Sequence, residues 1–185
     1  MAKQFPNIDD TQRRFIEAQK IFFTASATDT SRVNLSPRPT DTFRVVNPNT
    51  VLYLDNTGSG NETAAHLQIN NRLTIMMCSF EKVPQILRLY GQARVINRQS
   101  PEFNEIVEQH FNGNTPTGAR QVIMQTVDLV QTSCGFGVPF FDYVGERDTL
   151  TKWANKKGED GIKAYWKEKN QTSMDGLPTG LPVEG

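Results

Sequence analysis

The sequence has few of the residues that build metal centres or disulfide frameworks. Only two cysteines and two histidines occur among 185 residues. They do not recur at the short spacings with which proteins ligate zinc, so we expect no metal site. Cys78 lies in an apolar run, which is typical of a small buried side chain, and a disulfide with Cys134 is not expected. No Ser or Cys is placed with either histidine as in a catalytic triad, so no catalytic residue can be assigned.

Strong net charge and long apolar runs are also lacking. Lys+Arg and Asp+Glu count 20 each, so no net field favours nucleic acid or an anionic membrane surface. No apolar run approaches the roughly 20 residues that cross a bilayer, and the first residues do not resemble a signal peptide. We therefore expect a soluble, cytoplasmic protein that binds neither nucleic acid nor membrane.

Short segments of alternating polarity dominate the chain, and helices are inserted between them without regular alternation. Helices are predicted at 11–22, 61–69, 101–111, 148–156 and 159–169, and strands at 22–27, 32–36, 51–55, 73–80, 86–96 and 121–132. Pro37 and Pro39 are expected to end the second strand, and Gly158 to cap a helix in the left-handed conformation. The pattern predicts a mainly β fold, an antiparallel barrel with peripheral helices, and not a doubly wound sheet.

The length suits one domain with its own core. We expect an N-terminal helix within 1–21, a barrel core with inserted helices in 22–132, and C-terminal helices with a tail in 133–185. The tail is rich in Gly and Pro from residue 173 onward and is therefore expected to be extended.

The most informative stretch is the glycine-broken turn that starts at Thr57 and leads into the helix expected at 61–69. Backbone N–H groups at a helix start are a common place to hold a phosphate or another anion. Ser59 with Glu62 three residues later fits a capping box, so Ser59 is a plausible N-cap. On local pattern alone an ordinary capped connection is the more frequent explanation. Glu62 would also repel a phosphate unless it turned back to cap the helix.

A phosphate in this position requires a cationic partner, and the strand at 32–36 supplies candidates. Arg32, Asn34 and Ser36 share its polar face, and Arg38 lies just beyond. A guanidinium group can give a phosphate two parallel hydrogen bonds. A solvated face explains such a polar row equally well, and for Arg88 on a later strand solvent exposure is the better explanation.

Two glycines and a proline follow the last predicted strand and mark a specific backbone path at 131–139. Cys134 lies in this stretch. Nothing nearby in the sequence lowers the pKa of its thiol, so we favour a structural role or a place at the edge of a cofactor over a reactive cysteine.

Four stretches resemble the pyridoxamine 5'-phosphate oxidase-related proteins, which are flavin-binding split β-barrels. They are residues 36–38, 54–63, 71–76 and 89–95, and the similarity extends over roughly residues 22–130. The later stretches 133–139, 145–148 and 175–178 resemble one subgroup of mostly uncharacterised members. The resemblance implies an FMN-binding split antiparallel β-barrel, a homodimer with FMN at the subunit interface, and a small-molecule electron donor.

The resemblance also implies which residues contact FMN. The phosphate would be held by the strand that carries Ser36 and Arg38 and by the turn and helix start at 57–63. The backbone around Leu54 and Asp55 would lie along the flavin ring, with Arg88 nearby and Cys134 approaching from the partner chain. The full implied set is Ser36, Arg38, Leu54, Asp55, Thr57, Gly58, Ser59, Gly60, Asn61, Glu62, Thr63, Arg88 and Cys134.

Two departures from the family limit what the resemblance implies about activity. Many relatives have Arg or Lys where this chain has Asn61 and Glu62, so phosphate binding must depend on backbone N–H groups, hydroxyls and Arg38. The Arg and His pair that the oxidase uses for its pyridoxal substrate has no counterpart in residues 173–185. We expect an FMN-dependent oxidoreductase whose substrate the sequence does not name. The alternatives are a non-catalytic flavin-binding or redox-sensing module and a barrel that has lost FMN.

Overall fold

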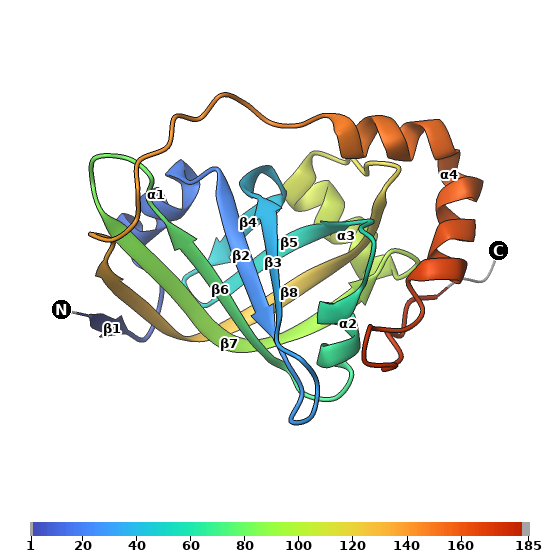
Figure 1. Ribbon diagram of the computed structural model, residues 1–185, viewed down its shortest axis with the longest axis horizontal. Helices are drawn as coiled ribbons and strands as arrows, with labels where there is room; N and C mark the ends of the chain where they lie inside the picture. Colours follow the sequence, from blue (N-terminus) through green and yellow to red (C-terminus); the bar gives the residue numbers. More distant parts are fainter. Residues whose placement is uncertain (1, 183–185) are drawn as a thin grey trace.

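The computed structural model describes residues 2–182 and is built around one curled antiparallel sheet (Figure 1). The strands are β1 (Lys3–Phe5), β2 (Ile21–Ser26), β3 (Asn34–Pro39), β4 (Phe43–Asn47), β5 (Thr50–Asn56), β6 (Arg72–Cys78), β7 (Gln85–Asn97) and β8 (Ala119–Cys134). The helices are α1 (Asp10–Ala18), α2 (Glu62–Leu67), α3 (Pro101–Phe111) and α4 (Thr149–Lys169). The strand order is β3-β2-β6-β7-β8-β5-β4, with β1 paired to β8. This confirms the mainly β split-barrel architecture.

The sheet curls until strands from its two ends share one interior. Phe22 of β2 packs against Phe43 of β4 and Tyr53 of β5, with ring centroids 5.0 and 5.4 Å apart. A bulge between Tyr90 and Gly91 bends the long β7–β8 pair, as bulges do, and increases the twist that makes this closure possible. The order ends at β3 on one side and β4 on the other, and this leaves the barrel split between these edges.

Three apolar clusters hold the helices to this sheet. The largest fills the barrel interior and includes Phe22, Tyr53 and Leu89. A second lies where α3 packs on β5, β7 and β8, and a third fixes α4 through Ile162 and Trp166. Each fully buried side chain of this size contributes about 1.5–3 kcal/mol, so the interior cluster dominates the stability of the barrel.

Several element boundaries differ from those expected from the sequence. The prolines do not end β3, and Pro37 and Pro39 lie within its pairing with β2. Because β3 is an edge strand, a proline can occupy positions whose N–H would face away from the sheet without loss of an interstrand hydrogen bond. The first helix ends at Ala18 instead of at residue 22. The sequence analysis missed β1 and β4, because β1 has three residues and β4 carries Arg44 among its apolar residues.

The C-terminal region also departs from expectation. Gly158 has a positive φ of 67°, but its ψ of 174° is extended and not left-handed helical, so it kinks α4 between two helical stretches. The tail is not extended over the residues that the structure describes. Turns at Gly176 and Gly180, both with positive φ, fold it back, and Thr172 bridges to Pro178. Residues 183–185 lie outside the described part. None of the described helices is both long and apolar enough to span a membrane.

Candidate functional site

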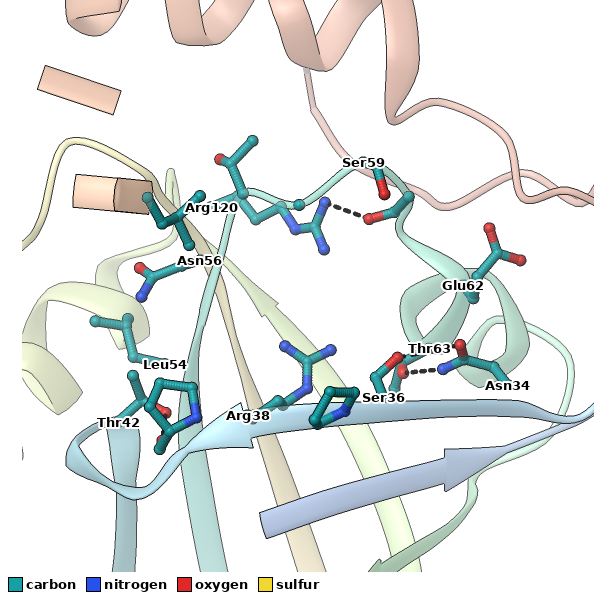
Figure 2. A pocket seen from close by; sticks show the side chains of 16 residues that line it. Asn34, Ser36, Arg38, Thr42, Leu54, Asn56, Ser59, Glu62, Thr63 and Arg120 are labelled. Carbon is teal, nitrogen blue, oxygen red and sulfur yellow. Dashed lines mark hydrogen bonds between the residues drawn. The ribbon is translucent and has the colours of Figure 1, made fainter. Parts of the chain in front are cut away.

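A cavity of about 430 Å³ lies between β3 and the turn that connects β5 to α2 (Figure 2). Nine residues of the implied FMN set line it, namely Ser36, Arg38, Leu54, Thr57, Gly58, Ser59, Gly60, Glu62 and Thr63. Asn34, Pro37, Pro39, Thr42, Asn56, Arg120 and Leu150 complete the lining. The strand and the turn that sequence reasoning paired as a phosphate site therefore face each other across one cavity.

The polar row on β3 forms a wall of this cavity. Asn34 donates from Nδ2 to Thr63 Oγ1 at 3.2 Å, and Ser36 Oγ donates to Asn34 Oδ1 at 3.1 Å. The alternate apolar residue Leu35 instead faces solvent and is 64% exposed. The polar row on β3 therefore lines a cavity and does not lie on an open solvated face, and its binding role stays a prediction.

Arg38 is the cationic group that the cavity presents. Its Nε donates to Thr24 Oγ1 at 3.3 Å, its Nη1 pairs with the Asp55 carboxylate, and its guanidinium lies 4.7 Å from the Tyr53 ring centroid. Burial alone would lower the pKa of Arg38, but Asp55 outweighs burial and raises it, so the group stays protonated. Among the described residues Nη2 has no hydrogen-bond partner, and Figure 2 shows the guanidinium pointing into the open space.

Asp55 lies behind the wall and holds it together. Its side chain is 1% exposed. One oxygen pairs with Arg38, while the other accepts from Arg120 Nε and Gln121 Nε2, each at 2.8 Å. Burial would raise the pKa of Asp55, but the two arginines and the Gln121 hydrogen bond lower it to about 2. The Asp55 side chain is therefore an ionised support of the cavity wall and does not line the cavity itself.

Arg120 is a site residue that sequence reasoning missed. Its side chain is 3% exposed, and its Nη1 donates to Gly60 O at 2.9 Å, so it fastens the turn to β8. The sequence offered only a weak signal, a charged residue at the start of a strand. In the β5–β8 ladder Asp55 lies opposite Gln121, the neighbour of Arg120. The contact between Asp55 and Arg120 could therefore be found only from the strand register.

The start of α2 differs from the expected capping box. Asn61 is the N-cap and makes no side-chain cap, so Ser59 does not cap this helix. Asn61 is buried and accepts from Gln121 Nε2 at 2.8 Å. Glu62 does not turn back to the helix start, because its carboxylate accepts the backbone N–H of Met174 at 3.1 and 3.2 Å. Because α2 has only six residues, its dipole is small, and Arg38 and the hydroxyl groups are the stronger hydrogen-bond donors of the cavity.

Arg88 and Cys134 lie outside this cavity. Arg88 Nη1 donates to Ser133 Oγ at 3.3 Å, and Cys134 pairs with Gln85 where β7 and β8 meet. Cys134 is exposed, whereas Cys78 is buried and burial raises the pKa of its thiol. A flavin contact for Arg88 and Cys134 stays a prediction. No group of three or more potential metal ligands gathers within residues 2–182.

A second cavity of about 550 Å³ adjoins the first. The two share Thr42, Leu54, Asn56 and Leu150 in their linings. The second is otherwise lined largely by amide and hydroxyl side chains from the α3–β8 connection and the start of α4. The two cavities are therefore adjoining spaces with one common border.

Comparison with known proteins identifies the family. A family model described as pyridoxamine 5'-phosphate oxidase matches residues 8–134. The chain belongs to the pyridoxamine 5'-phosphate oxidase family. One curated relative is the pyridoxamine 5'-phosphate oxidase family protein ustO from Aspergillus flavus, which is 36% identical over 192 residues. The alignment covers 94% of this chain and 76% of the relative.

Solved structures share the fold of this pyridoxamine 5'-phosphate oxidase family chain. HupZ from Group A Streptococcus aligns with a TM-score of 0.53 and 18% identity, covering 66% of this chain and 91% of HupZ. A candidate pyridoxamine 5'-phosphate oxidase from Lactobacillus delbrueckii aligns with a TM-score of 0.54 and 12% identity, covering 68% and 94%. Members of the family bind flavins, and the residues of the first cavity fit the phosphate of such a group. Arg38 supplies a free N–H and Thr63 a hydroxyl that only accepts within the chain, while the Ser36 hydroxyl would have to turn from Asn34 to the phosphate.

Proposed function

We propose that the protein is an FMN-dependent oxidoreductase that uses a small-molecule electron donor. The observation that carries the proposal is the half-buried, protonated Arg38, which points into a cavity that is also lined by the glycine turn implied by the family resemblance. A phosphate monoester needs a charge-assisted donor and hydroxyl partners, and this wall supplies both. FMN ends in a phosphate monoester, whereas in FAD a second phosphate and an adenosine follow. The choice of FMN over FAD is therefore the narrower claim to test.

The residues that would hold the cofactor come from the two facing walls. Arg38, Ser36 and Thr63 would bind the phosphate, and the turn at 57–60 would enclose it. Leu54 lines both cavities, and its backbone would run along the flavin ring, as the family resemblance implies. The second cavity would then receive the donor.

The bound flavin would supply the redox chemistry, which is the usual division of labour in cofactor enzymes. The chain would contribute binding, orientation and exclusion of water. The three charged residues in the first lining are each engaged, Arg38 and Arg120 by Asp55 and Glu62 by Met174. Proton transfer at the substrate is therefore not assigned to any of them.

The same observation favours a second candidate, a non-catalytic flavin-binding or redox-sensing module. Steady-state turnover separates the two. Rapid reduction of the bound flavin by a nicotinamide cofactor or a pyridoxine vitamer, followed by repeated turnover with oxygen or another acceptor, supports the enzyme. A protein that stays yellow and unreactive with every donor supports the module.

We also propose that two copies associate with FMN at their interface, as the family resemblance implies. In the connection from β8 to α4, Phe136, Phe140, Phe141 and Val144 are 65–99% exposed. A cavity of about 510 Å³ beneath this connection shares Pro37, Arg38 and Pro39 with the first one. A second copy seated there would cover exposed aromatic side chains and close the space beside Arg38.

Titration of FMN into wild-type protein and the Arg38→Ala variant tests the proposal. Loss of a charge-assisted hydrogen bond, about 1.5–3 kcal/mol, raises the dissociation constant more than tenfold. Arg72→Ala, which removes an exposed arginine on β6, is the matched control and leaves the affinity unchanged. If the wild type binds FMN and Arg38→Ala binds it equally well, Arg38 is not a phosphate ligand. If the wild type binds no FMN, the proposed function is wrong.

A further inference from the structure

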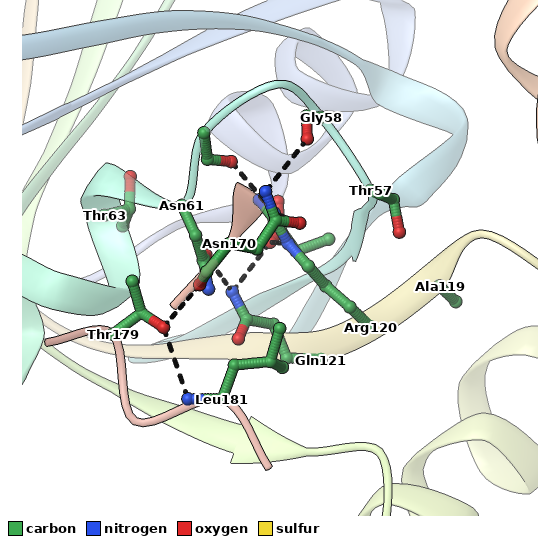
Figure 3. A network of polar contacts seen from close by, with 12 residues as sticks. Thr57, Gly58, Asn61, Thr63, Ala119, Arg120, Gln121, Asn170, Thr179 and Leu181 are labelled. Atoms are coloured by element: carbon green, nitrogen blue, oxygen red, sulfur yellow. Dashed lines mark hydrogen bonds and ion pairs between the residues drawn. The ribbon is translucent and has the colours of Figure 1, made fainter. Parts of the chain in front are cut away.

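The segment at residues 166–181 contacts the turn that forms one wall of the first cavity (Figure 3), and its Asp175 pairs with Arg32, just before the strand β3 of the other wall. We propose that this segment, called here the C-terminal clamp, holds the turn at 57–62 in its binding conformation, with Asn170 as its positioning residue. The proposal rests on the proposed function for the identity of the cofactor. The mechanical claim, that the clamp fixes the turn, depends only on contacts within the chain.

Asn170 is the central contact of the clamp. It is fully buried. Its Nδ2 donates to Gly58 O at 3.2 Å, and its Oδ1 accepts from Arg120 Nη1 at 2.9 Å. The same Arg120 nitrogen donates to Gly60 O at 2.9 Å. Asn170 and Arg120 together therefore bind two carbonyls of the glycine turn from behind.

Two further contacts fix the ends of the turn. At its start, Trp166 Nε1 donates to Thr57 Oγ1 at 2.7 Å, and both side chains are buried. At its end, the backbone N–H of Met174 donates to the Glu62 carboxylate at 3.1 Å. This last contact keeps the Glu62 charge on the clamp, and so reduces its repulsion of an anion in the cavity.

The clamp also reaches the opposite wall and is itself well ordered. Asp175 forms an ion pair with Arg32 and accepts its backbone N–H at 2.9 Å, two residues before β3 begins. Within the clamp, Thr179 Oγ1 donates to Asn170 O at 2.7 Å, and Ser173 N donates to Leu177 O at 2.8 Å. One folded segment thus holds the turn and also contacts the chain that leads into β3.

The physical reason for a clamp lies in the composition of the turn. Gly58 and Gly60 allow many backbone conformations, and ordering such a turn on ligand binding costs conformational entropy. Holding it in place beforehand removes that cost and raises affinity without a direct contact to the ligand. Asn170 therefore acts on the cofactor through the turn and does not line the cavity.

Amide hydrogen exchange in the cofactor-free protein tests the clamp directly. Asn170→Ala should speed exchange of the two hydrogen-bonded amides that flank the turn at least tenfold, namely those of Thr57 (to Gly118 O) and Ala65 (to Asn61 O), while amides in the middle of β7 exchange as in the wild type. The FMN dissociation constant should rise about tenfold in the same variant. Lys169→Ala, an adjacent and largely exposed position, is the matched control and should change neither quantity.

Each outcome decides the proposal. Unchanged exchange at Thr57 and Ala65 overturns the clamp whether or not FMN binds, and so does an equal increase throughout β7, which shows a general structural role. If the wild type itself binds no FMN, the proposed function is wrong, and the exchange result still decides the clamp. Should Asn170→Ala not fold, Asn170→Asp keeps the acceptor for Arg120 but replaces the donor to Gly58 O by a carboxylate oxygen that repels this carbonyl, with the same expected change in exchange.

Discussion

The Asp55→Asn variant probes the ion-pair network behind the cavity wall. The substitution keeps the shape of the side chain but removes the charge that faces Arg38 and Arg120. The Arg120 side chain is 3% exposed and would remain buried without a carboxylate. Removing one partner of a buried ion pair destabilises a protein by about 3–5 kcal/mol.

We expect the low end of this range, about 3 kcal/mol, because the amide keeps one acceptor oxygen. Arg120 also keeps its contacts with Gly60 and Asn170. For a chain of this length the change corresponds to a fall in Tm of roughly 6–12 °C. Urea unfolding at pH 7, followed by circular dichroism, measures the difference. Asp29→Asn is the control, since its ion pair with Arg72 is exposed, and its unfolding curve should match that of the wild type.

The stabilisation that Asp55 provides should decrease as the pH is lowered. The pKa of Asp55 falls from the usual 3.8 to about 2 in the folded protein. A lowered folded pKa contributes stability that is complete above the unfolded pKa and is lost as pH falls toward the folded one. The wild type should lose about 1 kcal/mol of this contribution by pH 3 and about 2 kcal/mol by pH 2, whereas Asp55→Asn has none to lose.

The gap in unfolding free energy between wild type and Asp55→Asn should therefore narrow as the pH is lowered. A gap at pH 7 that is below about 1 kcal/mol would show that the network does not stabilise the wall. A gap of the expected size that does not change between pH 7 and pH 3 would show that the Asp55 pKa is not depressed.

Two other predictions concern the barrel and its assembly. Gly91→Ala should destabilise the protein by about 3 kcal/mol, because a Cβ at this position would lie 2.0 Å from Thr126 O in the β7–β8 bulge. Gly137→Ala is the control and should leave the unfolding curve unchanged, because a Cβ there would have no atom within 4 Å. Equal curves for the two variants contradict this. For the proposed homodimer, sedimentation equilibrium at micromolar concentration should give the mass of two chains, and a single-chain mass contradicts it.

Much of the fold followed from local sequence patterns. Strands such as β7 and β8 alternate polar and apolar residues over many positions, and α3 begins at a serine cap followed by proline, so their identity was readable without tertiary contacts. The predicted end of β3 at its prolines was wrong, because a strand at the edge of a sheet tolerates proline and the sequence does not show that β3 is an edge strand. β4 was missed because its short sequence carries Arg44 between apolar residues.

The candidate site was only partly readable. Ser36, Arg38 and the glycine turn were identified from residue type and family resemblance, and they line one cavity. Asp55 was expected only to run its backbone along the flavin ring, and its side-chain support by Arg120 and Asn170 was not predicted. These residues are far apart in sequence and meet only through strand register and the return of the tail. The same long-range contact explains the failed capping box, since Met174 engages Glu62.

The absorption spectrum of the protein, recorded after saturation with FMN and removal of the free compound, tests the central claim most directly. The account predicts flavin bands in the protein fraction, release of FMN identified by mass, and loss of these bands in Arg38→Ala. A colourless protein, or one that retains FAD but not FMN, would contradict it.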